Sequence, residues 1–454
     1  MSFPSVDPAT GEKLREYPEW DTTRLDKALD LAATAAPRWA ALEVGERCKK
    51  LRELAAVLKR HRDEYAEIMS REMGKVMAEA KAEVEKCAGA CEYYADEAPK
   101  MLADLVIATD AKKSLVAYQP LGTLLAIMPW NFPFWQVIRA AAPALAAGNV
   151  VVLKHADNVP GCAMALDEAF QEAGFPTGTF QSLMISIPAV DEAIRDPRIH
   201  AVTLTGSEKA GRVVGKTAGE MLKKCVLELG GSDAFVVLED ADINLAASQG
   251  CISRFQNTGQ SCIAAKRFIL VDKVADAFLE AFRANAAALK SGDPRAEGVT
   301  LGPLARLDMR DKLHGQVQDA IERGAKPLLG CQKPTGKGAF YPASILDGVR
   351  PGMRVWSEEV FGPVACVIRV KDEEEALEVA NATHYGLGGS VWTRDVKRGE
   401  AFARRLQSGS AFVNRMVKSD QRLPFGGIKH SGHGRELSIH GIHEFVNIKT
   451  ISLD

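Results

Sequence analysis

The chain has 454 residues, which is too long for one ordinary hydrophobic core and predicts two or three domains. Its composition, 46% hydrophobic and 26% charged, is typical of a soluble globular protein. A formal net charge of −2 leaves no strong field that would attract nucleic acid or an anionic membrane, so we expect neither as a partner.

The cysteines favour a reducing compartment, because nine of them, an odd number, are scattered along the chain without a paired framework. Cys87 and Cys91 are four residues apart on a helical pattern, but no second His/Cys pair lies nearby, so we expect no metal site. The first residues lack the basic region and apolar core of a signal peptide. The apolar stretch 140–153 is interrupted by Pro143 and Asn149 and is too short for a membrane span. We expect a cytoplasmic protein.

The first hundred residues predict helices, because apolar residues recur at helical spacing in residues 22–105, as at Leu51, Leu54, Ala55 and Leu58. Residues 114–127 are then rich in β-type residues, and Pro120 argues against an interior strand at that point. From the residues alone, this segment is an ordinary edge hairpin.

Strands and helices alternate from residue 124 to 238. We predict strands at 124–127, 150–153, 180–184 and 201–204, and helices at 134–147, 161–173, 189–195 and 207–221. Such alternation implies a parallel sheet that binds ligands at the carboxyl ends of its strands. The segment from Gly206 through Ser207 to Gly211 follows a strand and opens a helix, which suits phosphate binding, although a plain strand–helix turn has the same pattern.

A second alternating region covers residues 234–412. It predicts strands at 235–238, 268–271, 365–370 and 389–392, and helices at 244–256, 275–290, 309–323 and 373–381. Residues 326–340, rich in Gly, Pro and Lys, predict a surface loop. Residues 444–453 alternate apolar and polar side chains and predict a final strand.

Cys262 lies between a predicted helix and a predicted strand, just after the turn-forming residues 257–259. A thiol at such a junction can be both held and exposed, and backbone N–H groups pointing at its sulfur would lower the pKa of the thiol. Most cysteines are simply small buried hydrophobes. A second unusual residue is Glu228, whose carboxylate lies in a strand-like apolar run before two glycines, where burial is costly without a role or a partner.

Glu228-Leu-Gly-Gly231 and Gly259-Gln-Ser-Cys262 resemble the general-base and nucleophile motifs of the aldehyde dehydrogenase superfamily. The resemblance continues, in the family's order and over nearly the whole chain, through Pro129-Trp-Asn-Phe-Pro133, Leu204-Thr-Gly-Ser207, Glu358-Glu-Val-Phe-Gly-Pro363 and Pro424-Phe-Gly-Gly427. It implies an α/β fold with a Rossmann-like NAD(P)-binding domain (residues 1–108 and 126–230), an α/β catalytic domain (231–425) and a β oligomerisation arm (109–125 and 436–454). It also implies a homodimer or homotetramer joined through that arm.

The resemblance implies oxidation of an aldehyde to a carboxylic acid. Cys262 would form a thiohemiacetal, and Asn131, with the backbone N–H of Cys262, would stabilise its oxyanion. After hydride transfer to the nicotinamide, Glu228 would activate the water that hydrolyses the thioester. From the residues alone, Asn131 could be a turn residue and Glu228 the partner of a basic side chain. Glu436 matches a family glutamate implicated in proton movement, with a surface salt bridge as the alternative.

For the cofactor, the resemblance assigns Gly206, Ser207 and Gly211 to the pyrophosphate turn, and Trp130, Glu359 and Phe361 to the nicotinamide end. Lys154 and Asp157 match the ribose-binding pair, although Asp157 stands where NAD-specific relatives have Glu. A carboxylate there disfavours a 2′-phosphate, so we expect NAD, with NADP possible if Asp157 points away.

For the substrate, Arg139 and Ser419 fall where succinate-semialdehyde dehydrogenases bind the substrate carboxylate, and the chain looks closest to their short bacterial group. Arginine suits a carboxylate because its planar fork can bond both oxygens, although Arg139 could instead be a solvated helical residue. Gln256 stands where many of these enzymes have an arginine, which weakens the assignment. We expect oxidation of succinic semialdehyde to succinate. The alternatives are other aliphatic or aromatic aldehydes, an acyl-transferring relative, and a non-catalytic binding or structural protein that reuses the fold.

Overall fold

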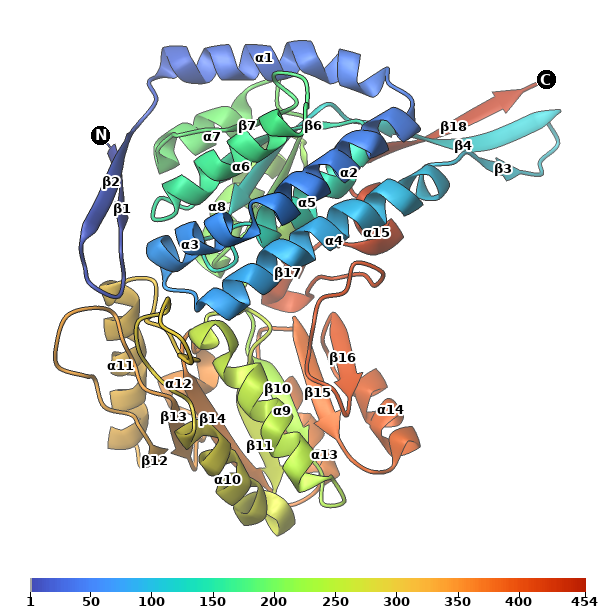
Figure 1. The fold of residues 1–454 in the computed structure, drawn as a ribbon. Coiled ribbons are helices and arrows are strands. Elements are labelled where there is room, and N and C mark those ends of the chain that lie inside the picture. Colours follow the sequence, from blue (N-terminus) through green and yellow to red (C-terminus); the bar gives the residue numbers. More distant parts are fainter. Residues whose placement is uncertain (1) are drawn as a thin grey trace.

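A hairpin and a layer of helices open the chain in the computed structural model, which describes residues 2–454. β1 (Ser2–Val6) pairs antiparallel with β2 (Lys13–Pro18) and runs beside both halves of the molecule (Figure 1). The predicted helices of residues 22–105 are confirmed as α1 (Thr22–Ala40), α2 (Val44–Arg60), α3 (Arg62–Met73) and α4 (Met77–Met101). In α2, Leu51, Leu54, Ala55 and Leu58 are all buried, as their helical spacing requires.

The first sheet carries the strands of the first alternating region, in the order β17-β9-β8-β5-β6-β7. Its neighbours pair in parallel except β17 and β9, which are antiparallel. β6 lies on one side of β5 and β8 on the other, so the strand order reverses there, and such a switch point is where open α/β sheets bind ligands. The elements are β5 (Thr123–Met128), α5 (Trp135–Ala146), β6 (Val150–His155), α6 (Pro160–Glu172), β7 (Phe180–Ser182), α7 (Ile187–Arg195), β8 (Ala201–Thr205), α8 (Glu208–Glu220), β9 (Lys224–Glu228) and β17 (Gly432–His433).

The second sheet has the order β12-β13-β14-β11-β10-β15-β16 and is parallel except for β12 against β13. Alternate side chains pack on opposite faces, with Val236 and Ile269 in one core cluster and Phe235 and Phe268 in the other. Its strands are β10 (Asp233–Val237), β11 (Ala265–Val271), β12 (Lys326–Leu329), β13 (Ser344–Asp347), β14 (Val364–Val370), β15 (Gly388–Trp392) and β16 (Ser410–Val413). The prediction of a loop over 326–340 is wrong at its start, because β12 pairs there with β13.

The connections of the second sheet are mainly helical. They are α9 (Ile243–Phe255), the 3₁₀ turn η1 (Gln256–Gly259), α10 (Asp272–Ala287), α11 (Leu307–Glu322), α12 (Arg354–Ser357), α13 (Glu373–Asn381) and α14 (Val396–Arg405). The turn η2 (Lys429–Ser431) and helix α15 (Ser438–His443) follow near the end of the chain. No helix within residues 2–454 is long and apolar enough to cross a membrane.

A third, antiparallel sheet projects from the body, as Figure 1 shows. It consists of β3 (Leu105–Ile107), β4 (Lys113–Pro120) and β18 (Val446–Leu453), in the order β18-β4-β3, which confirms the strand predicted at 444–453. Pro120 is the last residue of β4, where a missing N–H does least harm to the ladder. We propose that the three sheets mark a cofactor unit, a catalytic unit and an arm. The pairing of β3 with β4 puts residues 105–107, assigned above to the first domain, in the arm.

Candidate active site

The turn that carries Cys262 has an unusual backbone. Cys262 lies between η1 and β11, as predicted, and the turn before it contains three successive residues in the left-handed region, Asn257 (φ 54), Thr258 (φ 55) and Gly259 (φ 70). A β-branched residue rarely adopts this conformation, and such strain is found mainly at functional sites. A Cβ on Gly259 would lie 2.3 Å from the carbonyl oxygen of Gly362, so only glycine fits there.

Two buried cations hold this turn. The Arg254 guanidinium is fully buried and donates to the carbonyl oxygens of Gly259 (2.6 Å) and Ala265 (3.0 Å). The Lys266 ammonium donates to those of Ser261 (2.8 Å) and Cys262 (2.5 Å). The sequence analysis did not identify either residue. Each is a basic residue inside an apolar run, and this pattern could have indicated a structural role, because a buried cation is costly unless its donors form hydrogen bonds.

A cavity of about 720 Å³ opens beside the thiol. The cavity is lined by three residues for which the sequence analysis expected nucleophile or substrate roles, namely Cys262, Arg139 and Ser419. The aromatic residues Phe132, Trp135 and Phe425 also line the cavity. Further polar groups in its lining are Lys86, Lys418 and Gln256. A cavity of this size, lined by both apolar and polar side chains, is typical of a small-molecule site.

Burial and charge act in opposite directions on the pKa of the Cys262 thiol. Burial raises the pKa of Cys262 to about 12, and the nearby charges of Lys266 and Arg139 oppose this without overcoming it. In the described conformation, desolvation therefore outweighs the favourable charges. Glu228 also contributes to the raised pKa, which places its carboxyl group within electrostatic reach of the sulfur.

Glu228 ends β9 and is buried, with 2% of its surface exposed. Its carbonyl oxygen accepts the N–H of Gly206 (2.9 Å), which joins the candidate base to the turn before α8. Among residues 2–454, Glu228 Oε1 has no hydrogen-bond partner, and a Cβ on Gly426 would lie 2.7 Å from it. Burial, and then the charge of Glu436, raise the pKa of Glu228 well above its ordinary value.

Arg139 and Glu436 form a buried ion pair, with Arg139 Nε 2.5 Å from Glu436 Oε2. The contact is an ion pair rather than a well-aligned hydrogen bond. The guanidinium also donates to Thr205 Oγ1 (3.2 Å) and lies 4.7 Å from the centre of the Phe425 ring. Two alternatives are wrong, because Arg139 is not a solvated helical residue and Glu436 is not in a surface salt bridge. The substrate role of Arg139 stays a prediction.

Asn131 is buried beside the nucleophile turn, and its Nδ2 donates to the carbonyl oxygen of Gln260 (3.0 Å). The amide carries a second hydrogen, so one donor is still available for an oxyanion. The segment is firmly held, because Lys75 Nζ donates to the Asn131 carbonyl oxygen (2.9 Å). Glu83, the buried ion-pair partner of Lys75, accepts the N–H groups of Phe134 and Trp135 at the start of α5.

The predicted phosphate turn has the expected local geometry. Ser207 is the N-cap of α8, and its Oγ accepts the N–H of Ala210 (3.3 Å). The N–H groups of the first turn of a helix are the donors that phosphates use. Gly211 has a different role from Gly206, because a Cβ on Gly211 would lie 2.5 Å from Leu229 Cδ1, so its small size permits the packing of α8 against the chain after β9.

The other predicted cofactor residues also form contacts with one another. Lys154 Nζ forms an ion pair with Asp157 Oδ1 (2.6 Å) at the end of β6. Glu359 Oε1 accepts the N–H of Gly231 (3.0 Å) and lies 3.5 Å from Lys266 Nζ. The rings of Trp130 and Phe361 meet edge to face, with centroids 5.8 Å apart. These groups together fit a dinucleotide. The carboxylates can bind ribose hydroxyls, the helix N-terminus can bind phosphates, and the aromatic rings can contact a base.

Lys86 is a cavity residue that the sequence analysis missed. Its ammonium donates to Ser419 Oγ (2.5 Å) and lies 4.0 Å from the centre of the Trp135 ring. Burial lowers the pKa of Lys86 to about 8, and within the described chain Lys86 forms no ion pair. A lysine in a helix is normally a solvated residue, so its position gave no signal.

The dinucleotide-type strand edge beside a cavity fits a dinucleotide-dependent oxidoreductase. The model of the aldehyde dehydrogenase family matches residues 1–451, and the chain belongs to this family.

Individual relatives are similar over their full length. An NAD(P)+ succinate semialdehyde dehydrogenase of Escherichia coli is 48% identical over 450 residues, which cover 99% of this chain and 97% of the relative. A probable NADP+ succinate-semialdehyde dehydrogenase of Synechocystis is 48% identical over 451 residues, 99% of each chain. The crystal structure of succinic semialdehyde dehydrogenase from Streptococcus pyogenes with NADP+ has a TM-score of 0.97 at 38% identity, covering 99% of both chains. The expected aldehyde dehydrogenase fold is thereby confirmed.

Proposed function

We propose that this chain oxidises succinic semialdehyde to succinate with NAD(P)+. The family supports the reaction class, and the names of the relatives support the substrate. The structural observation that carries the proposal is that the Lys86 ammonium, bonded to Ser419, lines the same cavity as Cys262. A carboxylate held there would leave the aldehyde end of a short chain free to reach the sulfur.

In the proposed mechanism, Cys262 adds to the aldehyde carbon, and its proton leaves with solvent. Asn131 Nδ2 and the backbone N–H of Cys262 donate to the resulting oxyanion. When bound, NAD(P)+ accepts the hydride whose loss leaves an acyl group on Cys262 as a thioester. Glu228 then removes a proton from water, and the resulting hydroxide attacks the thioester. The C–S bond breaks, the acid leaves, and the Cys262 thiolate is reprotonated by the proton held on Glu228. Arg139 compensates the charge of Glu436 and so limits how strongly Glu436 opposes ionisation of Glu228.

Lys86 is a better anchor for the carboxylate than Arg139. The Arg139 charge is balanced by Glu436, whereas the Lys86 ammonium has only the neutral Ser419 hydroxyl and the Trp135 ring as close partners among residues 2–454. A substrate carboxylate would therefore gain more from Lys86. Because burial lowers the pKa of Lys86 to about 8, this attraction is present at neutral pH and is lost as the pH rises above 8.

Comparing succinic semialdehyde with butanal, which has the same number of carbons and no carboxylate, tests the substrate. We expect a higher kcat/KM for succinic semialdehyde, and Lys86→Met should lower it by about 10- to 100-fold while changing butanal oxidation by about twofold or less. Lys81→Met, at a partly exposed lysine of the same helix that pairs with Asp63 and does not line the cavity, is the matched control. A preference of the wild type for butanal would contradict the proposal, and equal losses with both aldehydes would remove Lys86 from carboxylate binding.

A second candidate function, oxidation of other aliphatic or aromatic aldehydes, rests on Gln256, which lines the cavity where many relatives of this kind are expected to have an arginine. The neutral amide of glutamine binds a carboxylate more weakly than a guanidinium, which is charged and can donate two parallel hydrogen bonds. Higher kcat/KM values for neutral or aromatic aldehydes in the same assay would favour this function.

Asp157 is proposed to set the choice between NAD+ and NADP+. Its half-exposed carboxylate would repel a 2′-phosphate, but the ion pair with Lys154 offsets part of that charge, which agrees with acceptance of both cofactors. Replacing Asp157 with Ser removes the repulsion and frees the ammonium. We expect the ratio of kcat/KM for NADP+ to that for NAD+ to rise about tenfold, measured at constant aldehyde concentration. An unchanged ratio would show that Asp157 does not face the 2′ position.

We propose that the arm makes the protein a homodimer or homotetramer. The arm strands expose apolar side chains, including Val106 on β3 (65% exposed) and Ile448 on β18 (59%), which a second copy of the chain would cover. Replacing both with Lys should convert the oligomer to monomer in size-exclusion chromatography with light scattering. Ile187→Lys, at an equally exposed apolar position on α7 (74%), should leave the mass unchanged. A wild-type monomer would contradict the proposal.

We also propose a cytoplasmic location. The nine cysteines of the sequence are all free within the described chain, and all but Cys225 and Cys262 are buried, which suits a reducing compartment.

A further inference from the structure

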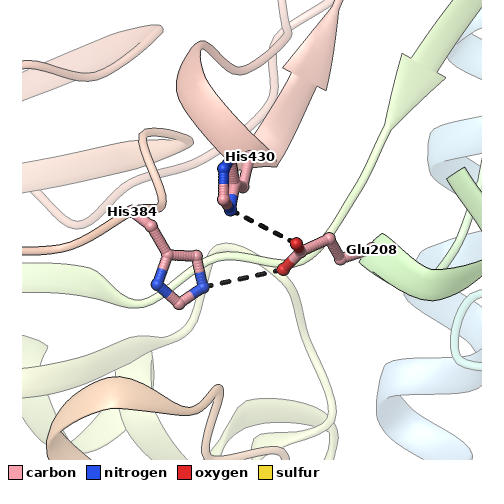
Figure 2. A group of neighbouring side chains, drawn as sticks. All are labelled: Glu208, His384 and His430. Carbon is pink, nitrogen blue, oxygen red and sulfur yellow. Dashed lines mark ion pairs between the residues drawn. The ribbon is translucent and has the colours of Figure 1, made fainter. Parts of the chain in front are cut away.

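Three potential metal ligands meet at the junction of the cofactor and catalytic units. Figure 2 shows the carboxylate of Glu208, the first residue of α8, facing both His384 and His430. His384 lies between α13 and β15, and His430 lies in η2. The side chains are 27%, 40% and 47% exposed, respectively, so an ion from solvent can reach all three. The cluster is separate from the Cys262 cavity, and no residue in it was singled out from the sequence.

The spacing of the ligand atoms suits one small cation. His430 Nδ1 is 3.2 Å from Glu208 Oε1, His384 Nε2 is 3.6 Å from Glu208 Oε2, and a set of one atom per residue lies within 4.8 Å of one another. Zinc bonds of about 2.0–2.1 Å in a tetrahedron put neighbouring ligands about 3.3 Å apart. The distance from His430 Nδ1 to Glu208 Oε1 is close to this value, and the distance from His384 Nε2 to the other carboxylate oxygen is slightly longer. Rotation of the exposed imidazoles can shorten the remaining distances between ligand atoms, which are at most 4.8 Å.

The backbone holds the two histidines together. The N–H of His430 donates to the carbonyl oxygen of His384 (2.9 Å), and the ring centroids are 4.9 Å apart. Burial lowers the pKa of His384, and the charge of Glu208 opposes this shift. Tyr385 packs beside the same ring, with centroids 4.1 Å apart, and supports its orientation.

Arg212 is the competitor for this carboxylate. Its Nε (3.0 Å) and Nη2 (2.6 Å) both bond Glu208 Oε1, and Oε2 faces His384. Partial burial acts to raise the pKa of Glu208, but Arg212 and His430 outweigh it and hold that pKa below its ordinary value. A bound cation would share Glu208 with Arg212 or displace its exposed side chain.

We propose that Glu208, His384 and His430 bind a divalent cation of the zinc type, with water completing its coordination. Two imidazoles and one carboxylate suit Zn²⁺ and its neighbours Co²⁺ and Ni²⁺, whereas Mg²⁺ and Ca²⁺ prefer oxygen ligands. The ion would join the first residue of α8, directly after the Ser207 cap, to two segments outside the first alternating region. This site does not depend on which aldehyde the enzyme oxidises.

Isothermal titration of the full chain carrying Cys262→Ala with ZnCl₂ tests the site without competition from that thiol. We expect one Zn²⁺ per chain, and His384→Ala and His430→Ala should each weaken binding about tenfold or more. His433→Ala, at an exposed histidine on β17, should leave binding unchanged, and Arg212→Gln should strengthen it by removing the competitor. MgCl₂ should give no comparable binding.

Cobalt provides a second measurement. Co²⁺ bound to this cluster should give visible absorption bands that disappear in His430→Ala. Absence of Zn²⁺ binding, or Zn²⁺ binding that both histidine variants retain, would overturn the proposal and leave Glu208 as an ion-pair partner of Arg212 and the two histidines.

Discussion

Replacing Cys262 with Ala is expected to abolish aldehyde oxidation, with a loss of about 10⁴-fold or more in kcat/KM, because the aldehyde carbon then has no nucleophile and no hydride can leave. The assay is formation of reduced nicotinamide with succinic semialdehyde. The chain offers a matched control in Cys251, whose thiol lines the same cavity but lies on α9 rather than on the strained turn. Cys251→Ala should retain most of the activity.

The pH dependence of alkylation tests the protonation state of the Cys262 thiol. Because the pKa of Cys262 is raised to about 12, its thiolate fraction should grow about tenfold for each pH unit between 7 and 9. Alkylation of Cys262 by iodoacetamide in the absence of NAD(P)+ should rise in proportion, without a plateau in that range. A plateau near neutral pH would show a thiol activated by its surroundings, and equal activity losses in both cysteine variants would remove Cys262 from its role as nucleophile.

Replacing Glu228 with Gln is expected to separate the two halves of the reaction. The first turnover does not need the base, so rapid mixing should show a burst of about one reduced nicotinamide per site. Hydrolysis does need it, so the steady-state rate should fall by about 10²- to 10⁴-fold. Since burial raises the pKa of Glu228 well above its ordinary value, its basic form accumulates as the pH rises. Wild-type hydrolysis should therefore rise with pH, and this dependence should be lost in the variant.

The fold of this variant should be intact, because Gln has the shape and the neutral charge of the protonated Glu228 side chain. An unchanged Tm would verify this. Loss of the burst together with the steady-state rate, at an unchanged Tm, would contradict the assignment and place Glu228 before thioester formation.

Local patterns predicted most of the regular elements. The helical spacing in residues 22–105 and the alternation of strands and helices after residue 124 appear in the structure, because these signals depend on neighbouring residues. The position of Cys262 between α9 and β11 was predictable for the same reason. Strand β12 could not be predicted in this way. It begins with Lys-Pro in a segment rich in Gly and Pro, which is typical of a loop, and it is a strand only because it pairs with β13.

The electrostatics of the site could not be predicted from local patterns. Arg139 and Glu436 are far apart in the sequence, and nothing near either residue indicates that they form a buried ion pair. Lys86 has the sequence environment of a solvated helical lysine until Trp135 and Ser419 pack around it. The pKa of Cys262 depends on how completely the fold removes water from the turn, and a sequence motif contains no measure of that.

The pairing of β17 with β9 has a consequence for synthesis on the ribosome. Gly432 lies opposite Glu228 in that ladder, and Glu436, only a few residues later, supplies the partner of Arg139. The carbonyl oxygen of Phe445 then accepts a hydrogen bond from Asn149 (2.9 Å), close to the start of β6. A nascent chain can form the helices and much of the first sheet early, but Glu228, the proposed base, stays uncovered until the segment of Gly432 to Glu436 has left the exit tunnel. We therefore expect a chain that stops before this segment to lack aldehyde oxidation.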